Sequence, residues 1–81
     1  MTMTKQVSLS QMYAGQRGTV LRVDGGMGLM SRLSAMGIRP GKKITKVSAM
    51  LMRGPVTVQV GNTRLAIGFG MASRILVELE P

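Results

Sequence analysis

The sequence predicts a mainly β fold: a small barrel of five strands, with one short helix inserted after the first strand. Several short segments alternate apolar and polar residues, which is the pattern of strands that bury one face. Glycine, proline and asparagine separate these segments. In one stretch the apolar spacing changes to that of a helix. The 81 residues suffice for one domain with a single core.

The chain is expected to begin with a flexible leader over residues 1–7, and the domain is expected to span residues 8–81. At the start of the domain, Ser8 or Ser10 is suited to cap one helical turn, because its hydroxyl can accept a hydrogen bond from a free backbone N–H group. The segment therefore predicts a single turn of helix before the first strand.

The first strand is predicted in the stretch RGTVLRVDGG, residues 17–26. Strict alternation along this strand would place Val20 and Val23 on opposite faces. Gly25 and Gly26 are expected to end the strand.

A short helix is predicted from Gly28 to Met36. Leu29, Leu33 and Met36 recur at the i, i+4, i+7 spacing that places apolar side chains on one face of a helix. Gly37 follows at the position where a helix commonly ends in a left-handed residue.

The dipeptide Pro40–Gly41 suits the two central positions of a type II turn, so the chain is expected to reverse there and to enter a strand. This strand is predicted over KKITKVSAMLMRG, residues 42–54, and is expected to bend. A bulge near Thr45–Lys46 would bring Ile44 and Val47 to the same face.

A β-hairpin is the clearest signal in the sequence. Valines alternate with polar residues over residues 56–60, Gly61–Asn62 supplies a two-residue turn, and Leu65 and Ile67 alternate beyond it. Residues 74–80 form the last predicted strand, after a glycine-flanked turn. Five strands and one early helix fit an SH3-like barrel best, and an OB-fold, whose helix usually falls later, is the second candidate.

The chain lacks the side chains on which most catalytic and metal sites depend. It has no cysteine and no histidine, and its acidic residues are Asp24, Glu78 and Glu80. Thiolate chemistry, histidine general bases and Cys/His zinc sites are thereby excluded, and paired-carboxylate chemistry has almost no material. The sequence predicts no catalytic residue, no cofactor and no metal site, and hence a protein that is not an enzyme.

The charge is strongly basic, because 11 Lys and Arg residues against three acids give a net charge of +8. Such a charge attracts anionic partners, so a nucleic-acid or anionic-surface binding module is the alternative function. Tyr13 and Phe69 are the only aromatic residues, and stacking platforms for nucleic-acid bases need more of them. No specific nucleic-acid partner is expected, and no apolar stretch is long enough to insert into a membrane.

Two further patterns have both a functional and a structural interpretation. GGMGLMSR, residues 25–32, resembles a phosphate-binding loop at the start of a helix, but its spacing fits neither common phosphate motif and favours a strand-to-helix connection. The nine methionines would suit a soft metal. They show no tight spacing, however, and are interpreted as core filling and as an adaptable contact patch.

Residues 49–52 are apolar on both faces of the predicted strand, directly before Arg53. If one face points outward, these side chains form a protein contact. A buried corner of the barrel is the other interpretation.

Three segments in sequence order resemble the FeoA-like ferrous iron transport accessory family: LSQMYAGQRGTVLRV, GLMSRLSAMGIRPGKKI and GPVTVQVGNTRLAIGFGMASRILVE. The most specific part is the R-L-x-x-M-G-[LI]-x-P-G joint, which runs here from Arg32 to Gly41. A terminal A-x-x-I-x-V strand, which begins here at Ala72, agrees with the family pattern. The resemblance covers nearly the whole chain after Ser8.

The resemblance implies a cytoplasmic SH3-like module without chemistry of its own. It implies an accessory protein that docks on the cytosolic part of FeoB, a membrane-embedded ferrous iron transporter, and that modulates iron uptake. Weak self-association is left open. We predict partner contacts in the helix and in the residues before the hairpin: Leu29, Met30, Arg32, Met50, Leu51, Met52 and Arg53.

Overall fold

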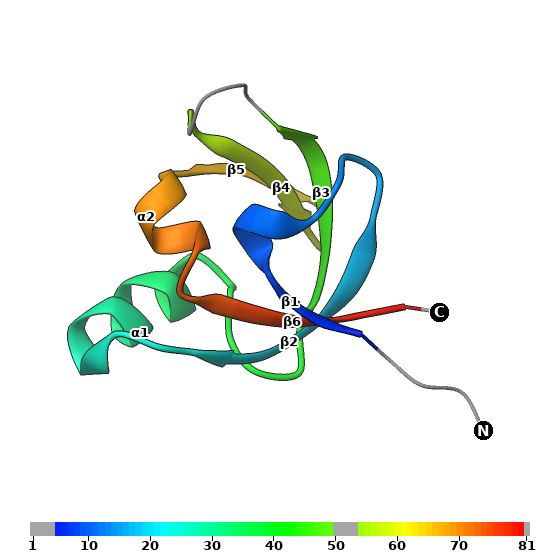
Figure 1. Ribbon diagram of the computed structural model, residues 1–81. Helices are drawn as coiled ribbons and strands as arrows, with labels where there is room; N and C mark the ends of the chain where they lie inside the picture. The colour runs from blue at the N-terminus through cyan, green and yellow to red at the C-terminus, as the bar shows by residue number, and fades with distance from the viewer. Residues whose placement is uncertain (1–4, 50–53, 81) are drawn as a thin grey trace.

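The computed structural model describes residues 5–49 and 54–80 of the chain (Figure 1). Within them it contains six strands, two α-helices and one 3₁₀ turn, η1. In chain order these elements are β1 (Gln6–Ser8), η1 (Leu9–Gln11), β2 (Arg17–Val23), α1 (Gly26–Ala35), β3 (Lys43–Ala49), β4 (Val56–Val60), β5 (Thr63–Ile67), α2 (Phe69–Ala72) and β6 (Ile75–Leu79).

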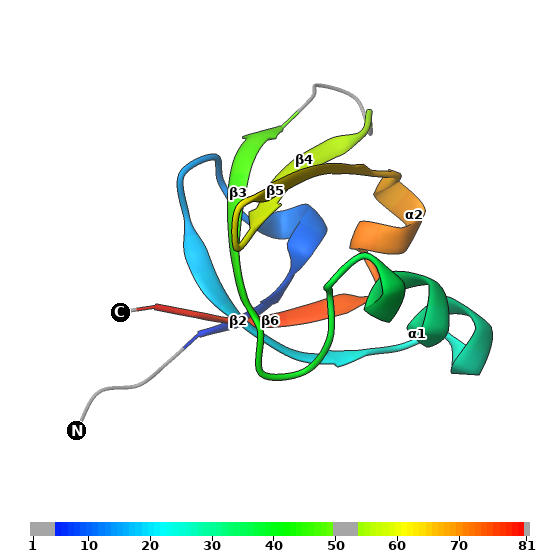
Figure 2. The ribbon, with the colours of Figure 1, turned by 180° about the vertical axis from the view of Figure 1, so that it is seen from behind.

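The strands form one antiparallel sheet in the order β1-β6-β2-β3-β4-β5. The sheet curls around a single core, and α1 lies outside this curve, next to the C-terminal end of β2 (Figures 1 and 2). The predicted mainly β fold with a short early helix is confirmed. The strand count was wrong by one, and among the described residues the end strands β1 and β5 do not pair with each other to close the barrel.

The extra strand comes from the predicted leader, so the flexible assignment of residues 6 and 7 is corrected. Gln6 lies opposite Glu78, and Val7 lies opposite Val77. This pairing gives β6 a neighbour on the side that β2 leaves open, and it satisfies backbone groups that an edge strand would expose. Residues 1–4 lie outside the described part of the chain.

In two strands, bulges make the side-chain directions differ from those expected. In β2 the pairing with β6 shifts between Val20 and Arg22. The inserted residue lets Val20 and Val23 point into the core together, although strict alternation would have separated them. In β3 the shift occurs between Lys46 and Ser48, one residue later than predicted.

The later bulge in β3 has a large consequence, because it leaves Lys46 on the inner face. Lys46 is 1% exposed. Its ammonium Nζ donates hydrogen bonds to the backbone carbonyl oxygens of Leu9 at 3.3 Å, Ser10 at 3.2 Å and Met12. Val47, which was expected inside, is half-buried. Burial lowers the pKa of the Lys46 ammonium below its ordinary value of 10.5.

The core is otherwise apolar, and every strand except β1 contributes a fully buried residue to it. Its buried side chains are Leu9, Met12, Val20, Val23, Leu33, Ile38, Ile44, Val56, Val58, Ile67, Ala72, Ile75 and Val77. The hairpin prediction is confirmed, since β4 and β5 pair up to Val60 and Thr63 around the two-residue turn. No helix in residues 5–49 or 54–80 is long and apolar enough to cross a membrane.

Candidate functional site

The joint at the end of α1 sets the position of everything that follows it. Gly37 has a φ of 90°, in the left-handed region that glycine adopts without strain. Its N–H donates to the Ser34 carbonyl at 2.9 Å, and the Ile38 N–H donates to the Leu33 carbonyl at 2.9 Å. These two bonds form a Schellman motif, and its apolar contact is supplied by Ile38 and Leu33, which are both buried.

The predicted turn at Pro40–Gly41 is also confirmed. The Lys42 N–H donates to the Arg39 carbonyl at 3.1 Å, which closes the turn. Two further bonds fix the turn to β2: Gly41 N–H donates to the Val20 carbonyl, and Val20 N–H donates to the Lys42 carbonyl, each at 2.8 Å. The loop between α1 and β3 is therefore held at both ends.

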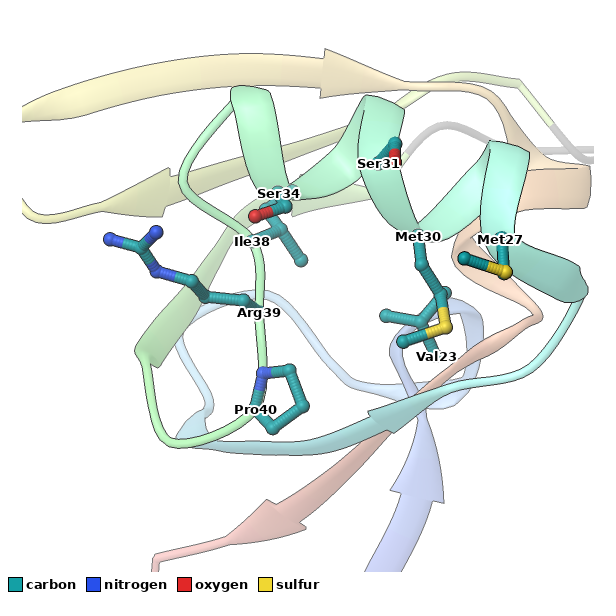
Figure 3. Close-up of a pocket in the computed structure, with 8 residues that line it drawn as sticks. All are labelled: Val23, Met27, Met30, Ser31, Ser34, Ile38, Arg39 and Pro40. Atoms are coloured by element: carbon teal, nitrogen blue, oxygen red, sulfur yellow. The ribbon is translucent and has the colours of Figure 1, made fainter.

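The helix α1 carries two stripes of side chains with different environments. Leu29, Leu33 and Met36 form the predicted stripe and pack on the core. A second stripe begins at Met27 and Met30 and also has the i, i+3, i+4, i+7 spacing of a helix face, through Ser31 and Ser34. This second stripe faces the loop that follows the helix (Figure 3).

Between that stripe and the loop lies an open groove of about 270 Å³. In Figure 3, Met27 and Met30 project from α1 toward Val23 at the end of β2, and Pro40 lies across from them. The groove is lined by Val23, Met27, Met30, Ser31, Ser34, Ile38, Arg39 and Pro40.

Two of the groove's apolar side chains are unusually exposed. Met27 is 84% exposed and Met30 is 43% exposed. Among the described residues, Tyr13 is the only other large apolar side chain that is exposed. Neighbouring exposed apolar side chains mark contact surfaces more often than isolated ones do, and methionine adapts its shape to varied partners.

The groove is apolar within and cationic at its rim. Arg39 extends outward from the loop (Figure 3). No carboxylate lines the groove in the described part of the chain. Asp24, which follows β2, is engaged with Arg22, whose Nε lies 3.1 Å from Asp24 Oδ1. The groove thus suits an apolar segment with acidic neighbours better than a small polar ligand.

The predicted contact residues have different positions. Met30 lines the groove. Leu29 is half-buried and packs against the core, and Arg32 is exposed on α1 but does not line the groove. Met50, Leu51, Met52 and Arg53 lie outside the described residues.

Sequence reasoning missed Met27, and it missed the side of the groove that the loop after α1 forms with Ile38, Arg39 and Pro40. Met27 belongs to the helical stripe that Met30 begins to define, so its spacing was a usable signal. Ile38, Arg39 and Pro40 gave no comparable signal, because only the folded joint brings them opposite α1. Asp24 and Gly25 connect β2 to α1, which begins at Gly26, so the segment is the strand-to-helix connection that its structural interpretation predicted.

No group of three or more His, Cys, Asp or Glu side chains within the described ranges is placed to hold a metal ion. The groove offers two thioethers, two hydroxyls and one guanidinium. These groups can make apolar contacts, hydrogen bonds and, at the guanidinium, an ion pair.

Comparison with known proteins identifies relatives for almost the whole chain. A family model described as the FeoA domain matches residues 7–79. A curated protein of Methanocaldococcus jannaschii, which its name assigns provisionally to Fe(2+) transport as protein A, is 38% identical over 64 residues. The match covers 79% of this chain and 76% of that protein.

Solved structures agree in fold. A crystal structure described as an iron uptake regulatory protein (FeoA) is 37% identical, with a TM-score of 0.88, over 94% of this chain and 100% of the other. Another, of Stenotrophomonas maltophilia FeoA complexed with zinc, is 28% identical, with a TM-score of 0.74, over 94% of this chain and 89% of that one. The latter is described as a prokaryotic SH3 domain protein, which confirms the SH3-like fold class.

Proposed function

The chain belongs to the FeoA domain family, and on that premise we propose that it is a non-catalytic accessory protein of ferrous iron transport. It docks on the cytosolic part of a FeoB-like membrane transporter and modulates iron uptake. Its location in this proposal is the cytoplasm. The relatives' names support the link to iron. Ferrous iron is the transporter's substrate in this proposal, and the accessory chain acts through protein contact.

The exposed pair Met27 and Met30 carries the docking proposal. Water in contact with these side chains is unfavourable, and a partner that covers them removes that cost. Full burial of a methionine side chain contributes about 1.5–3 kcal/mol. Because Met27 is 84% and Met30 43% exposed, covering the pair supplies about 2–4 kcal/mol before the costs of association. Such a contribution suits a reversible complex whose occupancy changes with conditions.

Arg39 adds direction to the contact. Because the groove has a cationic rim and no carboxylate of its own in the described residues, the partner segment is expected to place an apolar side chain in the groove and an acidic one at the rim. Docking then modulates uptake if the transporter presents this segment in one of its conformations more than in another. The bound chain stabilises that conformation by its differential affinity.

The earlier contact predictions are kept in part. Met30 is a direct contact in this proposal, and Leu29 supports the helix from the core side. Arg32 is exposed on the same helix and remains a predicted contact. The segment from Met50 to Arg53 also remains a predicted contact.

The test is calorimetric titration of the full chain with the cytosolic part of the ferrous iron transporter from the same organism. The double variant Met27→Ser, Met30→Ser should bind at least about tenfold more weakly, since it loses most of the apolar contact. Tyr13→Ser is the matched control, because Tyr13 is 76% exposed but does not line the groove. It should bind like the natural chain.

An equal loss of affinity in the Met27/Met30 variant and in Tyr13→Ser would contradict the groove as the docking site. Absence of any binding by the natural chain at high concentration would contradict docking itself. Ferrous iron uptake by cells that carry the double variant supplies the functional readout, and it should fall together with the affinity.

A further inference from the structure

The outer face of the sheet carries a row of polar side chains across four strands. In the strand register, Arg17 of β2 lies opposite Thr45 of β3. Thr45 lies opposite Gln59 of β4, and Gln59 lies opposite Arg64 of β5. Their strand neighbours, such as Ile44 and Val58, are buried, so alternation places the row on the face away from the core.

The turn before β3 adds further cations to this face. Lys43 precedes Thr45 by two residues and therefore shares its side of β3. Arg39, Lys42 and Lys43 line a depression of about 370 Å³, and Lys43 also lines a second one of about 320 Å³ with Arg17. Because the two depressions share Lys43 and Gly61, they form one surface. We call it the basic face: Arg17, Arg39, Lys42, Lys43 and Arg64.

Counter-charge on the basic face is small. Glu80 is the one carboxylate that lines either depression in the described residues. Its Oε1 lies 3.5 Å from Arg17 Nε, and its Oε2 lies 3.4 Å from Lys43 Nζ. The Arg17 and Lys43 side chains remain 67% and 79% exposed, so water screens these pairs and both cations stay accessible.

The other cations of the basic face lack a carboxylate partner altogether within residues 5–49 and 54–80. Arg39 and Lys42 make no ion pair there. Arg64 donates from Nε to the Gln59 side-chain oxygen at 3.4 Å and also makes no ion pair. Glu78 lies on β6, opposite Thr19, at the edge of this surface. With Glu78 counted beside Glu80, five cations face two carboxylates, and the surplus is positive.

We propose that the basic face adsorbs to the phosphate headgroups of an anionic membrane. The proposal rests on the proposed function, because that function places the chain beside a transporter embedded in a membrane. Arg39 lines both the basic face and the apolar groove. When the basic face lies on the headgroups, the groove therefore opens beside the membrane surface, where the cytosolic part of a transporter begins.

Lipid phosphate fits this surface better than nucleic acid does. No aromatic side chain lines the two depressions in the described residues, so the face offers no platform for stacking bases. Its cations come from strands and a turn, and among the residues that the structure describes no helix projects from it to enter a DNA groove. An anionic leaflet requires neither feature, because it attracts cations through surface potential alone.

Each cation contributes little to membrane adsorption, but the contributions of several cations multiply. Each Lys or Arg close to an anionic leaflet raises partitioning by about fivefold at low ionic strength. Five cations offset by two carboxylates therefore raise it by roughly a hundredfold. Added salt shortens the reach of these charges, so binding should fall steeply as ionic strength rises.

The test is sedimentation of the full chain with vesicles. The natural chain should sediment with an equal mixture of phosphatidylglycerol and phosphatidylcholine at low salt, and it should stay in solution with phosphatidylcholine alone. The triple variant Lys42→Gln, Lys43→Gln, Arg64→Gln should partition about 100-fold less well into the mixed vesicles. All three side chains are exposed, so the variant should fold.

A second triple variant serves as the charge-matched control: Lys5→Gln, Arg32→Gln, Arg74→Gln. These residues are exposed and line neither depression. Both variants lower the net charge of +8 by three. The control should lose less than about tenfold in partitioning, because the lost charges lie off the adsorbing face.

Three results would overturn the proposal. One is no sedimentation of the natural chain with the mixed vesicles at low salt. Another is an equal loss in the two triple variants, which would make net charge the cause. The third is tighter binding to duplex DNA than to the mixed vesicles, lost in the same triple variant, which would assign the face to nucleic acid.

The vesicles contain no transporter, so this experiment tests the membrane proposal independently of the docking proposal. The Met27→Ser, Met30→Ser variant should keep its vesicle binding, because it retains every cation of the basic face. If docking is absent but vesicle binding persists, the proposed function is wrong and the adsorbing face stands. If docking persists without vesicle binding, the proposed function stands and the membrane-adsorbing face is wrong.

Discussion

The groove beside α1 and the site of Lys46 depart from the usual rule of burial in opposite directions. At the groove, the apolar side chains of Met27 and Met30 face solvent. Under η1, the charged side chain of Lys46 is almost completely buried. Each arrangement is unfavourable for the isolated side chain, and the two differ in whether the molecule itself compensates for it.

Compensation at Lys46 is internal. An ammonium group has three donors, and here they meet three backbone carbonyls, two within η1 and one directly after it. No other buried side-chain nitrogen or oxygen in the described residues lacks a partner either. Lys46 therefore links β3 to η1 and has nothing left to offer a ligand.

The groove has no such compensation within the described chain. Its two methionines would gain from being covered, and nothing in residues 5–49 or 54–80 covers them. The comparison teaches that an unusual residue points to a partner only when its environment leaves it unsatisfied. Substitutions on the two sides should therefore behave differently.

The largest expected effect is at Lys46. Lys46→Met keeps the length and volume of the side chain but leaves three carbonyls without their donor. It should lower the free energy of unfolding by about 3 kcal/mol, measured by chemical denaturation. Met27→Lys, the reverse exchange at an exposed position, should change it by less than about 0.5 kcal/mol. Similar losses in both variants would break the comparison.

A smaller effect is expected at the joint that holds the second wall of the groove. Gly37→Ala should lower the free energy of unfolding by about 1–2 kcal/mol, because a side chain at a φ of 90° is strained. Gly28→Ala is the same exchange inside α1, at an ordinary φ, with no atom within 4 Å of the new Cβ. There it should stabilise by about 0.5–1 kcal/mol. Thermal unfolding of both variants would reveal whether the signs differ.

The smallest expected effect is a pH dependence from Lys46. Its pKa in the folded chain is lowered from 10.5 by burial, so between the two values the unfolded chain holds more protons than the folded one. The free energy of unfolding should therefore rise with pH through that window. The difference between the natural chain and Lys46→Met isolates this contribution. A difference that stays constant or falls with rising pH would contradict the assigned pKa direction.

Local signals predicted the joint and the hairpin well. Gly37 and Pro40–Gly41 act through backbone conformations that these residue types impose or permit within a few residues. The alternating valines of β4 act in the same way. The predicted core stripe of α1 followed from spacing alone and is confirmed by the burial of Leu33.

Other features had no local signal. The pairing of Gln6 and Val7 with β6 joins segments that lie about seventy residues apart in the sequence. The bulge after Lys46 is set by its partner strand and by the carbonyls of η1. Neither Arg39 nor Pro40 shows in the sequence which helix face it will meet.

The amino-acid sequence by itself determined where the chain turns, where α1 ends, that cysteine and histidine are absent, and how large the positive charge is. These properties depend on each residue and its close neighbours. Only the tertiary structure decided that a lysine is inside, that two methionines share a groove with Pro40, and that five cations share one face. Those outcomes depend on strand register and bulges, which are fixed by the summed packing of distant segments.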